Sequence, residues 1–191
     1  MFKEIKEGFL FTLVTLVLFG ALYPVLVWGV GRIVFPRNAE GSFIRKADGS
    51  ILGSELMGQV FTRPEYFHGR PSGVDYNAAS TGGTNYGPSN PDHLAAVRER
   101  ATEVVEREGV SLDQIPSDLV TASGGGLDPH ISPAAALIQV ERVARDRAVS
   151  AERVRELVNA HTEDPTFGFL GKPRVHVLKL NMALDSEVPK P

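Results

Sequence analysis

The feature that most constrains this chain is a run without a charged side chain, residues 8–31. As an α-helix this run would be about 36 Å long, because each residue adds about 1.5 Å, and the hydrocarbon core of a bilayer is about 30 Å thick. The run therefore predicts one transmembrane helix, which we place at residues 8–35. The alternative is a cleaved signal peptide, whose apolar stretch spans about 7 to 15 residues. We favour the retained anchor because the observed run is much longer.

Small and aromatic residues inside the run indicate how the helix is used. Glycines let helix backbones approach closely, and indole rings favour the membrane surface. A proline predicts a kink, because it lacks the N–H that would bond four residues back. The run carries no ionisable side chain, so partner chains would have to supply any transport route. We assign to the membrane anchor Gly8, Gly20, Pro24, Trp28 and Gly31.

Charge does not orient the helix. Lys3 and Lys6 flank one end, and Arg32 and Arg37 flank the other, so the positive charge of the two short flanks is nearly even. The chain has no cysteine, which neither requires nor excludes an oxidising compartment.

The part after the helix is acidic. The whole chain has 20 basic and 23 acidic residues, and setting aside Lys3, Lys6, Arg32, Glu4 and Glu7 leaves 17 basic and 21 acidic. A domain with this balance and no basic run is a poor candidate for binding nucleic acid or an anionic lipid surface. We therefore expect a membrane protein with no nucleic-acid partner.

Residues 36–191 are predicted to form one soluble domain. Apolar residues on either side of Asp48 and Gly49 predict a short hairpin at 42–44 and 50–52, with a further strand at 59–61. Apolar periodicity predicts helices from Asp92, as N-cap, to about 107, from Ser132 to about 147, and from Ser150 to about 161. Strict alternation predicts a last strand at 178–184. Together these elements predict a layered α+β fold.

Two loops hold the unusual residues. In residues 62–91, 15 of 30 residues are Gly, Pro, Ser or Asn, with four aromatic residues among them. Such composition predicts an ordered surface that contacts something, because aromatic residues are rare in solvated linkers. Residues 121–130 contain three consecutive glycines before a helix start. They suit an anion cradle or a tight turn, and we favour the turn because Pro129 and Pro133 lack amide donors.

Enzyme motifs are incomplete. The segment 167–173 resembles a phosphate loop, but Pro173 stands where a Ser or Thr should bind magnesium. The sequence has no Asp-Lys-Thr-Gly-Thr segment, and its five histidines lack zinc-ligand spacing. A serine hydrolase elbow fails at Ser123, because Thr121 occupies the position of the first glycine. We predict no catalytic residue and no metal site.

A series of short motifs covers nearly the whole chain, at residues 53–61, 66–67, 70–72, 76–77, 82–85, 87–88, 90–91, 118–123, 126–135, 173–175 and 178–181. In this order they closely resemble the C subunit of the Kdp potassium-transporting ATPase. The sequence departs from the family pattern at Thr84, Gly125 and His176, so the resemblance assigns no role to these three side chains.

The resemblance implies a non-catalytic subunit of a bacterial inner-membrane pump that imports potassium. ATP is then hydrolysed by a separate P-type subunit, ions enter through a channel-like potassium-binding subunit, and a small fourth membrane subunit completes the complex. The complex, and no cofactor of this chain, handles ATP, magnesium and potassium. Residues 1–7 are then cytoplasmic and residues 36–191 extracytoplasmic. The family is also described as a catalytic chaperone that raises ATP affinity, which is hard to reconcile with an external domain, because ATP is cytoplasmic.

We expect the two loops to meet partner subunits. Two alternatives are an anchored module that presents potassium or another small ligand to a transporter, and an anchored hydrolase; co-purification, ligand binding and turnover would separate the three. The predicted interface residues are Tyr66, Phe67, Arg70, Asp75, Tyr76, Asn77, Asn85, Asn90, Asp118, Ser123, Asp128 and His130.

Overall fold

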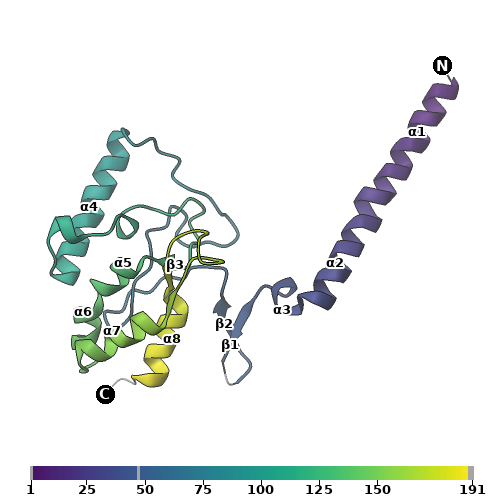
Figure 1. Cartoon of the computed structure of the whole chain (residues 1–191). Coiled ribbons are helices and arrows are strands. Elements are labelled where there is room, and N and C mark those ends of the chain that lie inside the picture. The colour runs from purple at the N-terminus through teal and green to yellow at the C-terminus, as the bar shows by residue number, and fades with distance from the viewer. Residues whose placement is uncertain (1, 47, 189–191) are drawn as a thin grey trace. The chain divides into compact units, whose positions relative to one another are not determined.

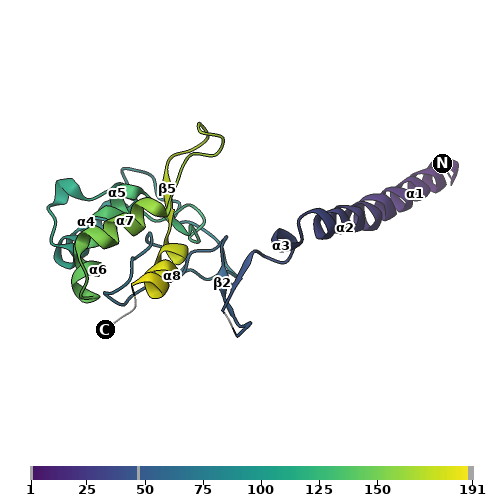
Figure 2. The ribbon, with the colours of Figure 1, turned by 60° about the horizontal axis from the view of Figure 1, so that its bottom comes forward.

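The computed structural model describes residues 2–46 and 48–188. The chain divides into two compact units, and the division falls between Ser54 and Glu55. The first unit contains the long apolar helix and a β-hairpin, and the second contains the remaining helices and a small sheet (Figures 1 and 2). The predicted mixture of helix and sheet is therefore confirmed. The hairpin belongs to the unit of the apolar helix, whereas the sequence interpretation counted it with the soluble domain.

The first unit begins with a continuous helix of 33 residues, Phe2–Val34, drawn in purple in Figure 1. It comprises α1 (Phe2–Val17), a π-helical turn (Leu18–Leu22) and α2 (Tyr23–Val34). At about 1.5 Å per residue it is about 50 Å long. Its length and composition allow it to cross a membrane, and its most apolar stretch has no buried residue.

The π-helical turn lies directly before Pro24. The Tyr23 N–H donates to the Leu18 carbonyl, five residues back, instead of four. Pro24 has no N–H, and its ring would collide with the carbonyl of Gly20 in a regular α-turn. A widened turn relieves this collision. The predicted effect of Pro24 is thus seen as a π-helical turn, with helix on both sides.

The hairpin is confirmed, slightly longer than predicted. After α3 (Pro36–Ala39), strands β1 (Phe43–Arg45) and β2 (Ile51–Ser54) pair antiparallel, with Phe43 opposite Ser54. The Asp48 Oδ1 atom accepts hydrogen bonds from the Ser50 N–H at 2.8 Å and from its hydroxyl at 2.6 Å. Gly49 takes a φ of +82°, which the tight connection requires.

In the second unit, α4 (Pro91–Glu108) starts earlier than predicted. Its N-cap is Asn90 and not Asp92, because the Asn90 side chain accepts from the Asp92 and His93 N–H groups. Pro91 fills the first helical position, where no N–H is needed. The helix ends at Gly109, which has a φ of +69°. Two 3₁₀ turns follow, Leu112–Gln114 and Ser117–Leu119.

The predicted helix from Ser132 to about 147 is two helices, α5 (Pro133–Leu137) and α6 (Val140–Asp146). The break lies at Gln139, whose side chain is fully buried and donates to the Ala135 carbonyl at 3.0 Å. The Gln139 N–H bonds only three residues back, to Ala136. The predicted helix from Ser150 is confirmed as α7 (Ala151–Ala160), with the Ser150 hydroxyl as its cap.

The predicted strand at 178–184 is wrong. These residues belong to helix α8 (Val177–Glu187), whose buried positions Val177, Leu180, Asn181 and Leu184 have helical spacing. Leu180 and Leu184 belong to the alternating series, and they are also four residues apart, as on one helix face. In addition, Leu, Lys, Met and Ala favour helix over strand. The strand predicted at 59–61 is also wrong, because these residues have no regular secondary structure.

The sheet of the second unit was not predicted. Its strands are β3 (His130–Ile131), β4 (Thr162–Glu163) and β5 (Arg174–His176), in the order β3-β5-β4 with both pairs antiparallel. Strands of two or three residues give too short a pattern to recognise in sequence.

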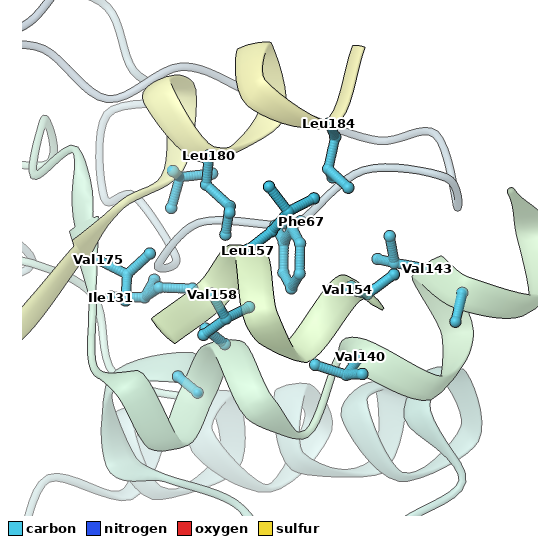
Figure 3. Packing of buried hydrophobic residues seen from close by; sticks show 14 of the residues in the cluster. Phe67, Ile131, Val140, Val143, Val154, Leu157, Val158, Val175, Leu180 and Leu184 are labelled. Carbon is cyan, nitrogen blue, oxygen red and sulfur yellow. The ribbon is translucent and has the colours of Figure 1, made fainter. Parts of the chain in front are cut away.

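The hydrophobic core of the second unit lies between the sheet and the helices (Figure 3). Figure 3 shows Phe67 pointing in among side chains of α6, α7 and α8. Helix α7 buries Val154, Leu157 and Val158, which are spaced as one face of a helix. The core therefore joins helices α4 to α8 to a segment of the long loop 62–91.

Candidate functional site

The long loop begins with a turn, in which the Tyr66 N–H donates to the Arg63 carbonyl at 3.2 Å, and side chains of the core hold the residues that follow it. The Asn181 amide accepts from the Phe67 N–H at 2.8 Å and donates to the Phe67 carbonyl at 2.9 Å. The Gln139 amide pairs in the same way with His68, at 2.8 and 3.2 Å. These side chains replace a neighbouring strand, because they satisfy both backbone groups of the residue that they face.

Two arginines complete this framework. Arg142 donates to the Tyr66 carbonyl at 2.9 Å and to Glu108 at 2.9 Å, and both charged side chains are buried. Arg147 donates to the Glu65 carbonyl at 2.9 Å and to Asp185 at 2.8 Å. Such buried cations require these partners, since an unpaired buried charge is very costly.

Tyr66 and Phe67, which were predicted to face partners, are buried. Phe67 has no exposed surface and belongs to the core cluster. The Tyr66 hydroxyl donates to Asp185 at 2.8 Å, and its ring lies under the guanidinium of Arg147, 5.0 Å from it. Both residues serve to fix the start of the loop.

The two predicted loops come together into one surface, which we call the two-loop platform (residues 69–85 and 121–130). Arg70 forms an ion pair with Asp128 at 3.0 Å, and the Tyr76 hydroxyl donates to the Arg70 carbonyl. The Ser72 hydroxyl donates to the Gly126 carbonyl at 2.7 Å. Gly83 lies so close to the other loop that a Cβ atom would be 2.6 Å from the Gly124 carbonyl oxygen. The glycine content therefore permits the contact between the loops.

Electrostatics stabilise this arrangement. Burial raises the pKa of Asp128, but hydrogen bonds from His130 and the charge of Arg70 outweigh it, so that the pKa is below its usual range. Burial, together with the Asp128 carboxylate, raises the pKa of the Tyr76 phenol. The platform thus contains a carboxylate that stays ionised and a phenol that stays neutral.

A cavity of about 700 Å³ lies beside the platform, between it and α4. Both acidic and basic side chains line it, and each of its arginines binds another group of the protein. Arg100 donates to the Val120 carbonyl at 3.2 Å, and Arg107 pairs with Glu108 at 2.7 Å. Residues from both the platform and α4 line it: Arg70, Asp75, Tyr76, Arg100, Glu103 and Arg107.

His68, at the edge of the same cavity, is held neutral. Burial and the nearby charge of Arg142 lower its pKa to about 4, although its ring nitrogen contacts the Arg63 carbonyl at 3.2 Å. A neutral imidazole adds a polar but uncharged group to the cavity wall.

The other predicted interface residues divide into two groups. Asp75, Asn77 and Asn85 are exposed, and Asp75 and Asn85 have positive φ values of 51° and 54°. Asn90 caps α4, and buried Ser123 donates its N–H to the Pro71 carbonyl.

Asp118 and His130 also make local contacts. Asp118 accepts from the Ser132 N–H at 2.6 Å and from its hydroxyl at 3.1 Å, so it holds the start of α5. The His130 ring meets the His176 ring edge-on, with centroids 5.1 Å apart. In residues 2–46 and 48–188, the structure brings together no group of three or more metal-binding side chains.

The framework residues Gln139, Arg142, Arg147 and Asn181 were missed in the sequence. Gln139 and Arg147 cap the two ends of α6, and Arg142 and Asn181 lie inside helices, each among buried valine, alanine or leucine. A polar residue among apolar helix residues predicts a buried polar group, but it does not indicate which backbone groups that side chain binds.

Comparisons with known proteins agree with these observations. The family model described as "K+-transporting ATPase, c chain" matches residues 5–186. The chain is 51% identical to the potassium-transporting ATPase KdpC subunit of Methylococcus capsulatus over 189 residues, covering 97% of this chain and 99% of the relative. It is 49% identical to that of Caldanaerobacter subterraneus subsp. tengcongensis, covering 100% and 98%. The subunit of Geobacter sulfurreducens is 48% identical, covering 98% and 100%.

The match includes the apolar helix, the hairpin, the two-loop platform and nearly all of α8. Identity near one half over almost the full length of both chains leaves no segment of the fold outside the comparison. The chain therefore belongs to the KdpC family, the c chain of K+-transporting ATPases.

Proposed function

We propose that this chain is a non-catalytic accessory subunit that stabilises the assembled potassium pump. Its partners are the P-type ATPase subunit, the channel-like potassium-binding subunit and a small fourth membrane subunit. Family membership supports an accessory role in a potassium pump. The single apolar helix supports a membrane anchor in such a complex.

The observation that carries the proposal is the two-loop platform. Ordering a long loop costs conformational entropy, which is recovered only if the ordered surface is used or buried. Here buried side chains of α6 and α8 hold the beginning of the loop, and the Arg70–Asp128 pair holds its middle. A surface that is ordered before binding loses less entropy on association. The platform therefore suits a docking surface for another subunit.

The proposed placement is a single pass through the bacterial inner membrane, with the N-terminus cytoplasmic and the second unit extracytoplasmic. ATP, magnesium and potassium are then bound by the other subunits. Any effect of this chain on ATP affinity is indirect, as a coupling free energy carried by the conformation of its partners. The engagement of the cavity arginines by protein groups supports an indirect effect.

The test uses Asp75, the exposed charge of the platform. Asn tolerates the positive φ of this position, so Asp75→Asn removes the charge without straining the turn. Asp113→Asn is the matched control, because Asp113 is an exposed acid in the 3₁₀ turn Leu112–Gln114. Each variant is expressed as the full chain with the other pump subunits and purified through a tag on this chain.

We expect Asp75→Asn to reduce the recovered ATPase subunit roughly threefold to tenfold, because a charge-assisted hydrogen bond contributes about 1.5 to 3 kcal/mol, partly offset by solvation. The Asp113→Asn control should recover the wild-type amount. Equal recovery for both variants would show that this side of the platform does not face a partner.

A further inference from the structure

The connection between β4 and β5 projects from the second unit. Glu163 and Arg174 are paired at its base, and ten residues lie between them. In Figure 2 this yellow-green loop extends away from the helices of the unit. Its tip, residues 166–170, which we call the aromatic turn, is closed by two backbone hydrogen bonds between Thr166 and Leu170, at 3.0 and 2.9 Å.

The aromatic turn exposes large apolar side chains. Phe167 is 84% exposed, Phe169 is 74% exposed and Leu170 is 51% exposed. Elsewhere in the second unit, Leu112 is a single exposed apolar residue in its part of the chain, and Leu56, Met57 and Val60 form a second exposed group that does not lie at a hairpin tip. Single exposed apolar residues are normal on a protein surface, whereas several gathered at one projecting tip mark an interaction site.

The backbone of the turn is strained at Phe167. Phe167 and Gly168 both have positive φ, 56° and 80°, and the Gly168 N–H donates to the Pro165 carbonyl at 2.8 Å. Gly and Asn tolerate positive φ, whereas a bulky residue there is unfavourable. Phe167 therefore lowers the stability of the fold in two ways. Its backbone has an unfavourable φ, and its apolar ring is exposed to water. Costs of this kind persist where a residue serves a function.

Charge and stiffness together favour a protein pocket over a lipid surface. The loop from Glu163 to Arg174 carries two acidic and two basic residues, and the chain as a whole is acidic, with a net charge of −3. Binding to anionic lipid would require an excess of positive charge. Pro165 and Pro173 restrict the two arms of the loop, and a stiff turn suits a shaped pocket, because little freedom is lost on binding.

We propose that the aromatic turn is a docking element whose two phenyl rings enter an apolar pocket on another protein subunit of the pump. The partner's pocket is lined by apolar side chains and sits on a surface that the second unit reaches. This inference rests on the proposed function as a pump subunit. It names a contact separate from the two-loop platform, so the two can fail independently.

The test replaces Phe167 with asparagine, which tolerates the positive φ of this position. Phe167→Asn removes the ring and relieves the backbone, so the variant should melt at the wild-type temperature or above it. Full-length tagged chain is expressed with the other pump subunits, and retention of the ATPase subunit is measured after washing. We expect retention to weaken roughly tenfold or more, the effect of losing one buried aromatic side chain. Phe169→Ser should weaken it similarly.

The matched control is Leu112→Asn, which removes another exposed apolar side chain of the same unit and should retain the pump like wild type. If both turn variants also retain the pump like wild type, the inference is overturned while the proposed function stands. If wild-type chain retrieves no pump subunit, both are overturned. A Phe167→Asn chain that melts lower in parallel with its lost retention would show a structural role and overturn the docking element.

A cross-link identifies the occupant. The chain has no cysteine, so Phe169→Cys creates a single thiol that can carry a benzophenone photo-cross-linker. Transfer to a pump subunit in native membranes supports the proposal. Transfer to lipid alone, with the same yield in membranes that contain only this chain, would overturn it in favour of insertion into the bilayer.

Discussion

At the scale of single residues, Arg70, Asp75 and Asp128, three of the four charged residues predicted to face partners, have different surroundings. Arg70 and Asp128 bind each other at 3.0 Å, and each is more than half buried. Their charges are therefore used to join the two loops, and alanine at either position would report on loop structure. Asp75 is exposed, which makes it the residue of the three that can report on a partner. Ordinary loop composition could not distinguish these cases.

The buried histidine at the cavity makes stability depend on pH. In the unfolded chain the pKa of His68 is about 6.5, and in the folded chain it is about 4. As the pH falls, the unfolded state binds a proton at this histidine before the folded state does. The contribution of His68 to the free energy of unfolding is therefore complete above pH 6.5 and is lost as the pH falls towards 4. After allowance for solvent screening we expect a loss of about 1 to 2 kcal/mol between pH 7 and pH 4.5.

The measurement is unfolding of the full chain in detergent, followed by near-ultraviolet circular dichroism at several pH values. His68→Gln can still donate to the Arg63 carbonyl, but it does not titrate. The pKa of His176 is also lowered, mainly by burial, and it is present in both proteins, so the difference between them isolates His68. Parallel pH profiles for wild type and His68→Gln would contradict the prediction.

At the scale of elements, α8 fixes the loop through one amide. Asn181→Ala would leave the N–H and carbonyl of Phe67 without partners inside the core. Each buried group that loses its partner costs about 1 to 3 kcal/mol, so we expect a loss of about 2 to 4 kcal/mol in the free energy of unfolding. Asn159→Ala on the exposed face of α7 should be nearly neutral. Denaturant unfolding in detergent measures the free energy of unfolding of both variants. Similar values for the two would show that the Asn181 amide does not stabilise the fold in this way.

The apolar helix is predicted to contact a partner helix as well as anchor the chain. A Cβ atom on Gly29 would meet no atom of this chain within 4 Å, so Gly29→Leu should not disturb the helix itself. If a neighbouring helix approaches closely there, the larger side chain separates the two, and recovery of the pump falls severalfold. Val27→Leu, at another exposed position of the same helix, is the control. Unchanged recovery for Gly29→Leu would leave the helix as an anchor only.

At the scale of the whole molecule, we expect the purified chain to bind ATP no more tightly than millimolar. The arginines of the cavity already engage Asp128, Glu108 and the Val120 carbonyl. The net charge of −3 and the incomplete phosphate loop further disfavour a triphosphate. Isothermal calorimetry with magnesium and ATP on the full chain tests this expectation. A saturable heat at micromolar ATP would contradict it and would support a direct chaperone mechanism.

The sequence alone determined the features that depend on neighbours along the chain. The uncharged run predicts a long apolar helix because apolar content over twenty residues is a local property. The hairpin around Asp48 and Gly49 and the helix capped by Ser150 follow from turn and cap chemistry, which acts within a few residues. The ordered motifs were also enough to indicate the family, as the comparisons show.

Only the tertiary structure decided the features that depend on distant partners. The apolar residues in 178–184 alternate as in a strand, and Leu180 and Leu184 are also four residues apart, as on one face of a helix. Burial of these two residues against the core selected the helix. Gln139 interrupts a helix because its amide binds His68, 71 residues away in sequence. Tyr66 and Phe67 are core residues because Asn181 and Asp185 lie opposite them. Such pairings are set by the packing of the whole unit, and no pattern within one segment contains them.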